Sequence, residues 1–264
     1  GADSLDFARI KKGILISIIL GLMIYAALGV YSDYSKAAGA VSAFNYAYLP
    51  FILMLAPMNY VLRYIKWSYY LRLLDVEINR SDNIRIFAAG LAMTVTPGKV
   101  GEFLKSYLIK EIKGVPMSVT SPLIVIERLT DGISMIILAS IGALKFKFGA
   151  GLMIVSVLLV VFFISFVRIK PFALGIIMLL KRLPLLKKLG AQMDAFYSSS
   201  YRLLELKPLV FSVAVGIISW GFEGIVIYLA LRGFGSPISV LSSVFTVAFS
   251  SIAGALSMLP GGLF

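Results

Sequence analysis

Cysteine and histidine are both absent from the 264 residues of this chain. Without thiols these residues form no disulfide, and without thiolate or imidazole they lack the usual ligands of zinc and similar metals. A nucleophile–histidine pair is excluded as well. We therefore expect no metal site, no cofactor and no catalytic residue of these kinds.

Charged residues are scarce too. They make up 14% of the chain, whereas hydrophobic residues make up 59%. A soluble domain carries about 25% charged residues. A single core cannot bury this much apolar surface, so lipid must cover part of it. The composition therefore predicts a membrane protein.

The apolar residues gather in six stretches, each near the about 20 residues that a helix needs to cross the hydrocarbon core. The stretches are 13–31, 43–65, 117–144, 150–167, 208–231 and 237–259. A shorter run, 84–96, ends at Pro97-Gly98 and is typical of a re-entrant half-helix. We predict an all-α fold in one polytopic transmembrane domain, 1–264.

Acidic residues are fewer than basic ones, with 13 Asp and Glu against 25 Lys and Arg and a formal net charge of +12. Twenty of the 25 fall in the segments 1–12, 63–113 and 168–207, which the predicted spans place on one side, and four fall on the other. Such a bias marks cytoplasmic loops. We predict a multi-pass protein of the cytoplasmic (inner) membrane with a cytoplasmic N-terminus. Basic loops here indicate a lipid with an anionic phosphate headgroup as partner, and no nucleic acid; a homo-oligomer is left open.

Three charged residues, Glu127, Arg128 and Asp131, interrupt the third apolar stretch. A charge at membrane depth costs at least about 2.5–3.5 kcal/mol on insertion scales, so such groups usually face a cavity or one another. At helical spacing all three can share a face, where one cation partly neutralises two carboxylates. The pattern favours a functional polar site. The alternative is a structural ion-pair cluster that joins two helices.

The segment after the short apolar run breaks the chain. Pro97 removes a hydrogen-bond donor, and Gly98 and Gly101 permit close backbone approach. A helix that starts there would point free N–H groups and a partial positive charge into the protein, and Lys99 adds a full charge. This predicts an anion site, for instance for a lipid phosphate. The alternative is an ordinary loop that enters an interfacial helix.

Other basic segments suit the membrane surface. Lys99–Lys113 and Gly190–Lys207 carry apolar residues at helical spacing, and we interpret them as interfacial helices that rest on headgroups. The second span closes with Arg63, Lys66, Trp67 and Arg72, which we interpret as snorkelling anchors. A role in gripping a headgroup, for Arg63 above all, is the alternative.

Glu223 is a lone carboxylate well inside the fifth apolar stretch. The flanking Gly221 and Gly224 could let another helix approach closely. The carboxyl group is either protonated and structural, or paired with Arg128 or Lys99.

The last apolar stretch ends at Pro260-Gly261-Gly262, which echoes the break at Pro97-Gly98. Paired interrupted segments in two halves of a sequence point to a transporter site near the bilayer midplane. The echo therefore predicts that both breaks border one site.

The position of this echo suggests two related halves, roughly 1–148 and 149–264. The sequence stops at Phe264, directly after the second break. A helix that ends in free backbone groups at membrane depth would be costly. We therefore expect the natural chain to continue.

Four motifs occur in order: Arg63-Tyr-Ile-Lys-Trp67, Thr96-Pro-Gly-Lys-Val-Gly-Glu102, Glu127-Arg-Leu-Thr-Asp131 and Pro260-Gly-Gly262. With them the chain resembles, over nearly its whole length, the transmembrane domain of lysylphosphatidylglycerol synthases and the stand-alone membrane proteins similar to it. The resemblance implies a stand-alone member without the aminoacyl-transfer domain. Full-length domains of this kind have more spans and a Gly-x-x-Glu tail after the final Pro-Gly-Gly.

What the resemblance implies for function is lipid translocation by a flippase-like domain. Transferred by position, the polar site consists of Lys99, Glu102, Glu127, Arg128 and Asp131. We hypothesise a lipid transporter that moves a phospholipid or a polyprenyl-linked lipid between leaflets. Lys99 would hold the phosphate, the carboxylates would attract a cationic substituent or relay protons, and Arg128 would organise them.

Two alternatives come from other functional classes. One is an intramembrane lipid-modifying enzyme that uses Glu127 and Asp131 as acid and base. The other is a membrane scaffold that binds a cytosolic partner through its basic segments. The absence of histidine and cysteine disfavours the enzyme.

Overall fold

The described part of the chain is built from helices alone, and the predicted all-α fold is confirmed. The computed structural model describes residues 41–143 and 190–257, with single positions at 23, 39, 151, 154, 155, 157, 158 and 161. The elements, with η for a 3-10 helix, are η1 (Tyr46–Tyr48), α3 (Leu49–Leu73), α4 (Arg80–Ala92), η2 (Met93–Val95), η3 (Pro97–Phe103), α5 (Leu104–Lys113), α6 (Met117–Ala143), α9 (Gly190–Leu203), α10 (Leu206–Gly233) and α11 (Val240–Ser257).

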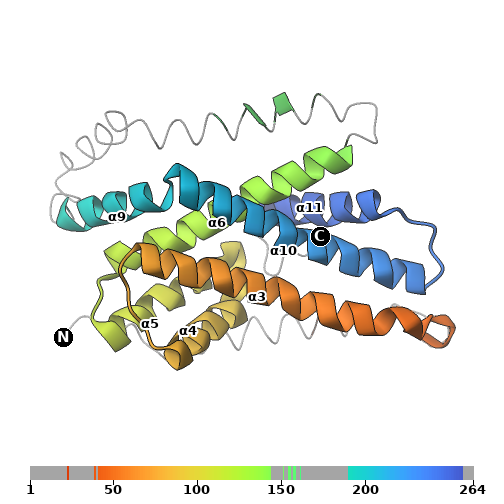
Figure 1. Ribbon diagram of the computed structural model, residues 1–264, viewed down its shortest axis with the longest axis horizontal. Helices are drawn as coiled ribbons and strands as arrows, with labels where there is room; N and C mark the ends of the chain where they lie inside the picture. The colour runs from red at the N-terminus through yellow and green to blue at the C-terminus, as the bar shows by residue number, and fades with distance from the viewer. Residues whose placement is uncertain are drawn as a thin grey trace.

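The helix α10 is central to the arrangement. It packs against α3, α6 and α11, and α11 also packs against α6. Figure 1 shows α3 and α10 running lengthwise through the molecule, with the short helices α4, α5 and α9 at the end where α3 finishes and α10 starts. The short helices therefore gather at one end of a bundle of long ones.

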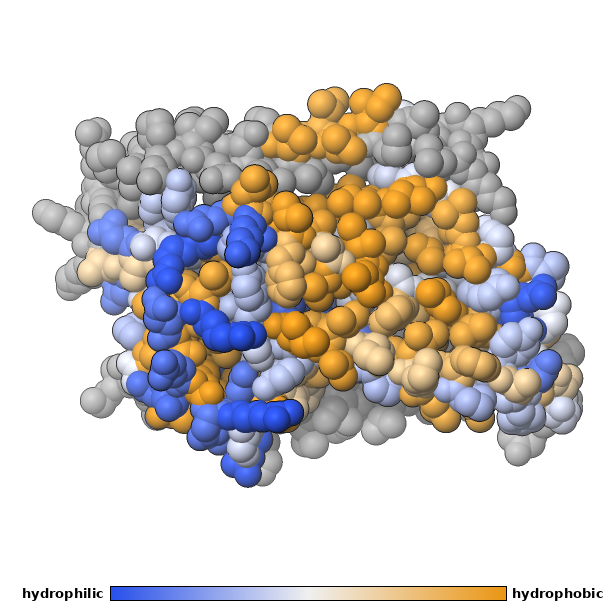
Figure 2. Space-filling view, in the orientation of Figure 1, coloured by the Kyte–Doolittle hydropathy of each residue, from blue (hydrophilic) through white to orange (hydrophobic). Residues whose placement is uncertain are grey.

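Hydrophobic side chains form a belt across the middle of the long helices, on the face that Figure 2 shows. Figure 2 shows this belt between a large polar region, at the end that carries α4 and α5, and a smaller polar region at the opposite end. On α3 the residues Phe51, Leu53 and Met54 are each more than half exposed. Two described segments, Tyr46–Leu73 and Leu206–Gly233, have the length and composition to cross a membrane. The belt suits contact with lipid hydrocarbon.

Most predicted spans within the described ranges are helices. The 117–144 and 208–231 stretches are confirmed as α6 and α10, and α11 occupies most of the 237–259 stretch. The stretches 13–31 and 150–167 lie outside the described residues, apart from single positions.

The helix α3 continues well beyond its predicted end. The sequence places Arg63, Lys66 and Trp67 at the headgroups, but the helix runs on to Leu73. Lys66 and Trp67 are fully buried, and Arg63 is 6% exposed. Trp67 Nε1 donates a hydrogen bond to Asn83 Oδ1 at 2.7 Å, and both cations face carboxylates of α6. The snorkelling interpretation is therefore wrong for these three residues.

The half-length helix α4 starts earlier than the apolar run suggests. Asn79 caps it, because its Oδ1 accepts the backbone N–H of Asp82 at 2.8 Å. The helix ends at Ala92, one 3-10 turn before the break. Its re-entry into the bilayer stays a prediction.

At the break, Thr96 is extended, with φ −68° and ψ 149°, as expected for a residue before proline. The following seven residues, Pro97–Phe103, form a 3-10 helix, so the α-helix predicted from Lys99 begins only at Leu104. The predicted amphipathic segment Gly190–Lys207 is not one helix. The helix α9 ends at Leu203, and Lys207 belongs to α10.

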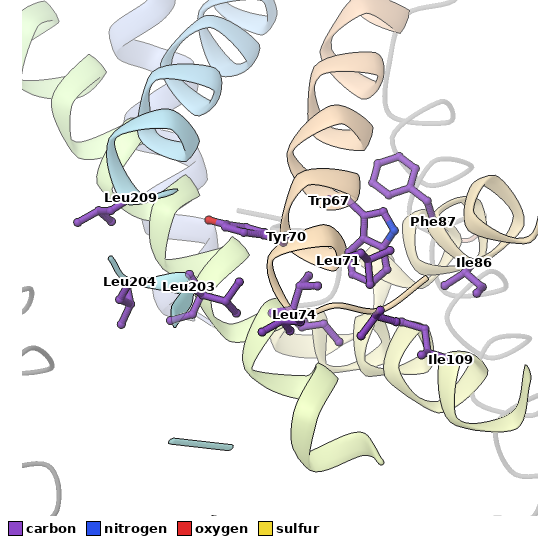
Figure 3. Close-up of a cluster of buried hydrophobic side chains, with 14 of the residues drawn as sticks. Trp67, Tyr70, Leu71, Leu74, Ile86, Phe87, Ile109, Leu203, Leu204 and Leu209 are labelled. Atoms are coloured by element: carbon purple, nitrogen blue, oxygen red, sulfur yellow. The ribbon is translucent and has the colours of Figure 1, made fainter. Parts of the chain in front are cut away.

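The main hydrophobic core lies where α4 and α5 pack on α3. Figure 3 shows Trp67 of α3 close to Phe87 of α4, with Ile109 of α5 in the same cluster. The junction of α9 and α10 adds Leu203, Leu204 and Leu209 to it. Through this core α5 packs against α4 and α6, and η3 directly before it contacts the same two helices.

The helices α10 and α11 approach closely at Gly224. A Cβ placed on Gly224 would lie 2.6 Å from Val244 Cγ2 and 2.8 Å from Val244 Cα, whereas one on Gly221 would have nothing within 4 Å. The close approach predicted for these two glycines is confirmed at Gly224 and wrong at Gly221.

We expect Gly224→Ala to lower the free energy of unfolding by about 1–3 kcal/mol, because the backbone of Val244 leaves no room for a methyl group. Gly221→Ala is the matched control and should be neutral or slightly stabilising, since alanine favours the helix. Equilibrium unfolding in mixed detergent micelles measures both. Equal losses in the two variants would contradict this packing.

Candidate functional site

Eight charged side chains from three parts of the chain meet near the α4–α5 end of the bundle. We call them the ionic cluster. The helix α6 supplies Glu127, Arg128 and Asp131, α3 supplies Arg63 and Lys66, and the segment from η3 into α5 supplies Lys99, Glu102 and Lys105. The structure therefore brings together the charged residues that the sequence analysis singled out in separate motifs.

Glu127 lies at the centre of the ionic cluster and is fully buried. Its Oε2 accepts a hydrogen bond from Lys105 Nζ at 2.7 Å. Its Oε1 accepts one from Arg128 Nη2 at 3.1 Å and lies 4.0 Å from Arg63 Nη2. Cations from three elements thus surround one carboxylate, which offsets much of the cost of burying it.

Arg128 connects the carboxylates to one another. Besides Glu127, it reaches Asp131 Oδ2 at 3.0 Å through Nη2 and Glu102 Oε1 at 3.3 Å through Nη1. Lys66 of α3 donates a hydrogen bond to the other oxygen of Asp131. Arg128 thus forms ion pairs with all three carboxylates of the ionic cluster.

Lys105 is enclosed by aromatic rings and backbone. Its Nζ lies 4.5 Å from the ring centre of Trp67 and 5.9 Å from that of Phe87. Its aliphatic stem passes so close to Gly90 that a Cβ there would lie 2.5 Å from it. With Glu127 and Glu102 as partners, this lysine is fixed in place and acts as a structural cation.

Lys99 differs from the other lysines of the ionic cluster. Its backbone has φ +57°, in the left-handed region that side chains other than glycine rarely adopt. Its Nζ lies 5.8 Å from the ring centre of Trp220, and among the described residues no carboxylate lies within 4 Å of it. Burial lowers the pKa of its amine, and the charges of Arg128 and Arg63 lower it further.

The ionic cluster has more positive than negative charge. Its five basic side chains face three carboxylates, an excess of two positive charges. Three buried nitrogen donors of this region lack a hydrogen-bond partner among the described residues: Arg63 Nε, Arg128 Nε and Trp220 Nε1. The buried acceptors Glu102 Oε1 and Asp131 Oδ2 also lack a hydrogen bond, but both form ion pairs with Arg128. Buried donors without partners cost free energy. Excess cations and unpaired donors together are the properties of an anion site.

A second polar group lies beside the ionic cluster on α3 and α10. Asn59, one helical turn before Arg63, donates a hydrogen bond to Glu223 and accepts one from Ser219. Glu223 was expected either to be protonated and structural, or to pair with Arg128 or Lys99. Among the described residues it forms no ion pair with either cation and accepts the hydrogen bond of the Asn59 amide. Its protonation stays a prediction.

Two of the N–H groups at the helix start after Pro97, which the sequence suggested would be free, are occupied. The N–H of Lys99 donates to Thr96 O at 2.8 Å, and the N–H of Gly101 donates to Thr96 Oγ1 at 2.8 Å. Close backbone approach is confirmed at Gly101, where a Cβ would lie 2.8 Å from Met93 Cε. Pro260, Gly261 and Gly262 lie outside the described residues.

Sequence analysis left four members of this region out of the site: Lys105, Asn59 and Trp220, which it did not single out, and Lys66, which it interpreted as a membrane anchor. The spacing of Asn59, Arg63 and Lys66 on α3 is i, i+4, i+7, a signal that they share one helical face. Lys105 follows Glu102 by three residues, which also places them together. Trp220 gave no such signal.

A cavity of about 770 Å³ opens beside the core, between the end of α3 and the start of α4. Its lining includes Tyr64, Arg72, Arg80 and Asn83. None of the eight members of the ionic cluster lines it, so it is a separate surface feature.

Comparison with known proteins identifies the family. The family described as "Lysylphosphatidylglycerol synthase TM region" matches residues 18–263. The chain belongs to this family. The matched residues include the elements that carry the ionic cluster. Membership of this family supports a location in the membrane, and so do the two described segments that are long and apolar enough to span one.

Two curated membrane proteins are similar to this chain. A UPF0104 membrane protein of Methanothermobacter thermautotrophicus is 22% identical, over 96% of this chain and 82% of the relative. A UPF0104 membrane protein of Methanocaldococcus jannaschii is 26% identical, over 64% of this chain and 73% of the relative. No solved structure matches the chain.

Proposed function

We propose that this protein is a lipid flippase that moves a phospholipid or a polyprenyl-linked lipid between the leaflets of the cytoplasmic membrane. The N-terminus and the polar α4–α5 end face the cytoplasm in this proposal, in accord with the distribution of lysine and arginine. The bound group is the anionic phosphate of the lipid headgroup.

The observation that carries this proposal is the excess of positive charge in a buried cluster beside a hydrophobic belt. Buried cations without counter-ions are costly, and a phosphate would both neutralise them and accept hydrogen bonds from the unpaired donors of Arg63 and Arg128. The apolar surface of α3 would leave the lipid chains in the bilayer. Lys99, which has no carboxylate within 4 Å among the described residues, is the cation most available to the ligand.

The test is leaflet translocation of a fluorescent phospholipid in proteoliposomes. We expect the double variant Glu127→Gln with Arg128→Ala to lose translocation, because both changes dismantle the ionic cluster. Glu111→Gln is the matched control, since Glu111 is an exposed carboxylate on α5. Each variant is first shown to elute as a monodisperse protein.

Equal rates for wild type and the double variant would remove the ionic cluster from the mechanism. Mass spectrometry of the recovered lipid distinguishes transport from chemistry, since a transporter returns it unchanged. Turnover of the lipid would favour the enzyme alternative. A wild-type protein that neither moves nor modifies lipid, but binds one cytosolic partner in stoichiometric amount, would favour the scaffold alternative.

A further inference from the structure

Glu223 is set apart from the other interior carboxylates. Glu102, Glu127 and Asp131 each have a cation within hydrogen-bonding or ion-pair distance. Within the described residues, Glu223 has no such ion pair, and its closest partner is the neutral amide of Asn59. A carboxylate inside a membrane helix that lacks a counter-ion is a candidate for reversible protonation.

The charges that act on Glu223 belong to the ionic cluster. Arg63 follows Asn59, the hydrogen-bond partner of Glu223, by one turn of α3. Lys99 Nζ lies 5.8 Å from the ring centre of Trp220, three residues before Glu223 on α10. Positive charges at these places favour an ionised carboxylate, and the nearby like charge of Asp131 on α6 disfavours it. The other described elements packed on α10 contribute little, since α11 has no ionisable side chain and η1 has only tyrosines. The state of Glu223 therefore depends on how much positive charge Arg63 and Lys99 present to it.

Arg63 is shared between the two polar groups. It lies one helical turn from Asn59, its Nη2 is 4.0 Å from Glu127, and its Nε has no described partner. A phosphate bound between Arg63 and Lys99 would cancel the positive charge that stabilises the Glu223 carboxylate. The carboxylate would then take up a proton from the aqueous phase.

We infer that the lipid phosphate and a proton bind together, so that Glu223 couples lipid translocation to a proton gradient. This inference rests on the proposed flippase function and adds its energy source. The step is the protonation of one carboxylate on phosphate binding and its deprotonation on release. By linkage, a proton whose uptake accompanies lipid binding must also strengthen that binding. Translocation is fastest when the leaflet that supplies the lipid faces the more acidic compartment.

The first experiment imposes a pH gradient across proteoliposomes and measures translocation of a fluorescent phosphatidylglycerol. This phosphodiester does not itself titrate near neutral pH, so a response reports on the protein. Wild type is expected to speed up in one direction of the gradient and slow down in the other. Glu223→Gln, which cannot titrate, is expected to translocate at one rate in both directions, and Glu111→Gln should behave as wild type.

The second experiment measures phosphatidylglycerol binding to the detergent-solubilised protein across neutral pH. Uptake of one proton predicts that affinity falls about tenfold for each unit of pH increase, and that Glu223→Gln flattens this slope. If Glu223→Gln does not fold, wild type alone still tests the inference, because lipid binding must raise the pH of a weakly buffered solution.

The two proposals fail separately. Wild type that moves no lipid in any gradient would overturn the flippase proposal and, with it, the coupling. Translocation by wild type that ignores the gradient, together with binding that has no pH slope, would leave the flippase intact and overturn the role of Glu223. A gradient response that persists in Glu223→Gln would also overturn that role.

Discussion

Lys66→Met is expected to lower the free energy of unfolding by about 3–5 kcal/mol, because it removes one partner of a buried ion pair. Lys66 is fully buried on α3 and donates a hydrogen bond to Asp131 of α6. Without it, the remaining ion-pair partner of Asp131 among the described residues is Arg128, which two other carboxylates already share. Equilibrium unfolding in mixed detergent micelles measures the loss.

An exposed pair provides the control for this prediction. Arg85 lies 3.5 Å from Asp82 on α4, and its side chain is 78% exposed. Arg85→Met should change the free energy of unfolding by less than about 1 kcal/mol. Lys66→Met combined with Asp131→Asn should recover part of the loss, since it leaves no unpaired charge. Similar small effects for Lys66→Met and Arg85→Met would contradict the buried pair between α3 and α6.

Lys99→Gly is expected to reduce translocation by about 10- to 100-fold, the value of a charge-assisted hydrogen bond to phosphate of about 1.5–3 kcal/mol. The free energy of unfolding of this variant should stay close to that of wild type. At φ +57° glycine relieves backbone strain of order 1 kcal/mol, which offsets the lost contact of Lys99 with the Trp220 ring. Activity and stability are therefore expected to separate at this position.

Two variants serve as controls for Lys99→Gly. Lys99→Arg keeps the charge and should retain most translocation. Trp220→Phe keeps an aromatic ring but removes the unpaired indole N–H, and a smaller loss is expected. Translocation assays combined with thermal unfolding in detergent measure both properties. A Lys99→Gly protein that is unstable yet translocates normally would show that Lys99 serves the fold rather than the ligand.

The part of the candidate site that could be predicted from the sequence consists of charged residues within an apolar stretch. Glu127, Arg128 and Asp131 interrupt an apolar stretch, and charge in such a stretch needs a compensating partner wherever it lies. Their three-dimensional neighbours could not be predicted in the same way. Lys66 and Lys105 sit in basic segments where solvent exposure is the ordinary expectation, and their partners belong to another helix.

Helix boundaries were predictable where a capping or breaking residue marks them and not elsewhere. Thr96 before a proline marked a real break. The end of α3 was misplaced because Arg63 and Lys66 resemble interface residues when only the local sequence is considered. The separation of α9 from α10 at Leu204 depends on burial of that leucine in the core, a tertiary effect that no local pattern reports.

The opposite faces of α3 limit how this helix can move. Asn59, Arg63 and Lys66 point into the protein, while Phe51 and Leu53 face outward. Turning the helix about its own axis would carry two cations into hydrocarbon, at a cost of about 2.5–3.5 kcal/mol each. The rotation of α3 about its own axis is therefore restricted. Any conformational change that involves this helix is expected to tilt it or to shift it along its axis.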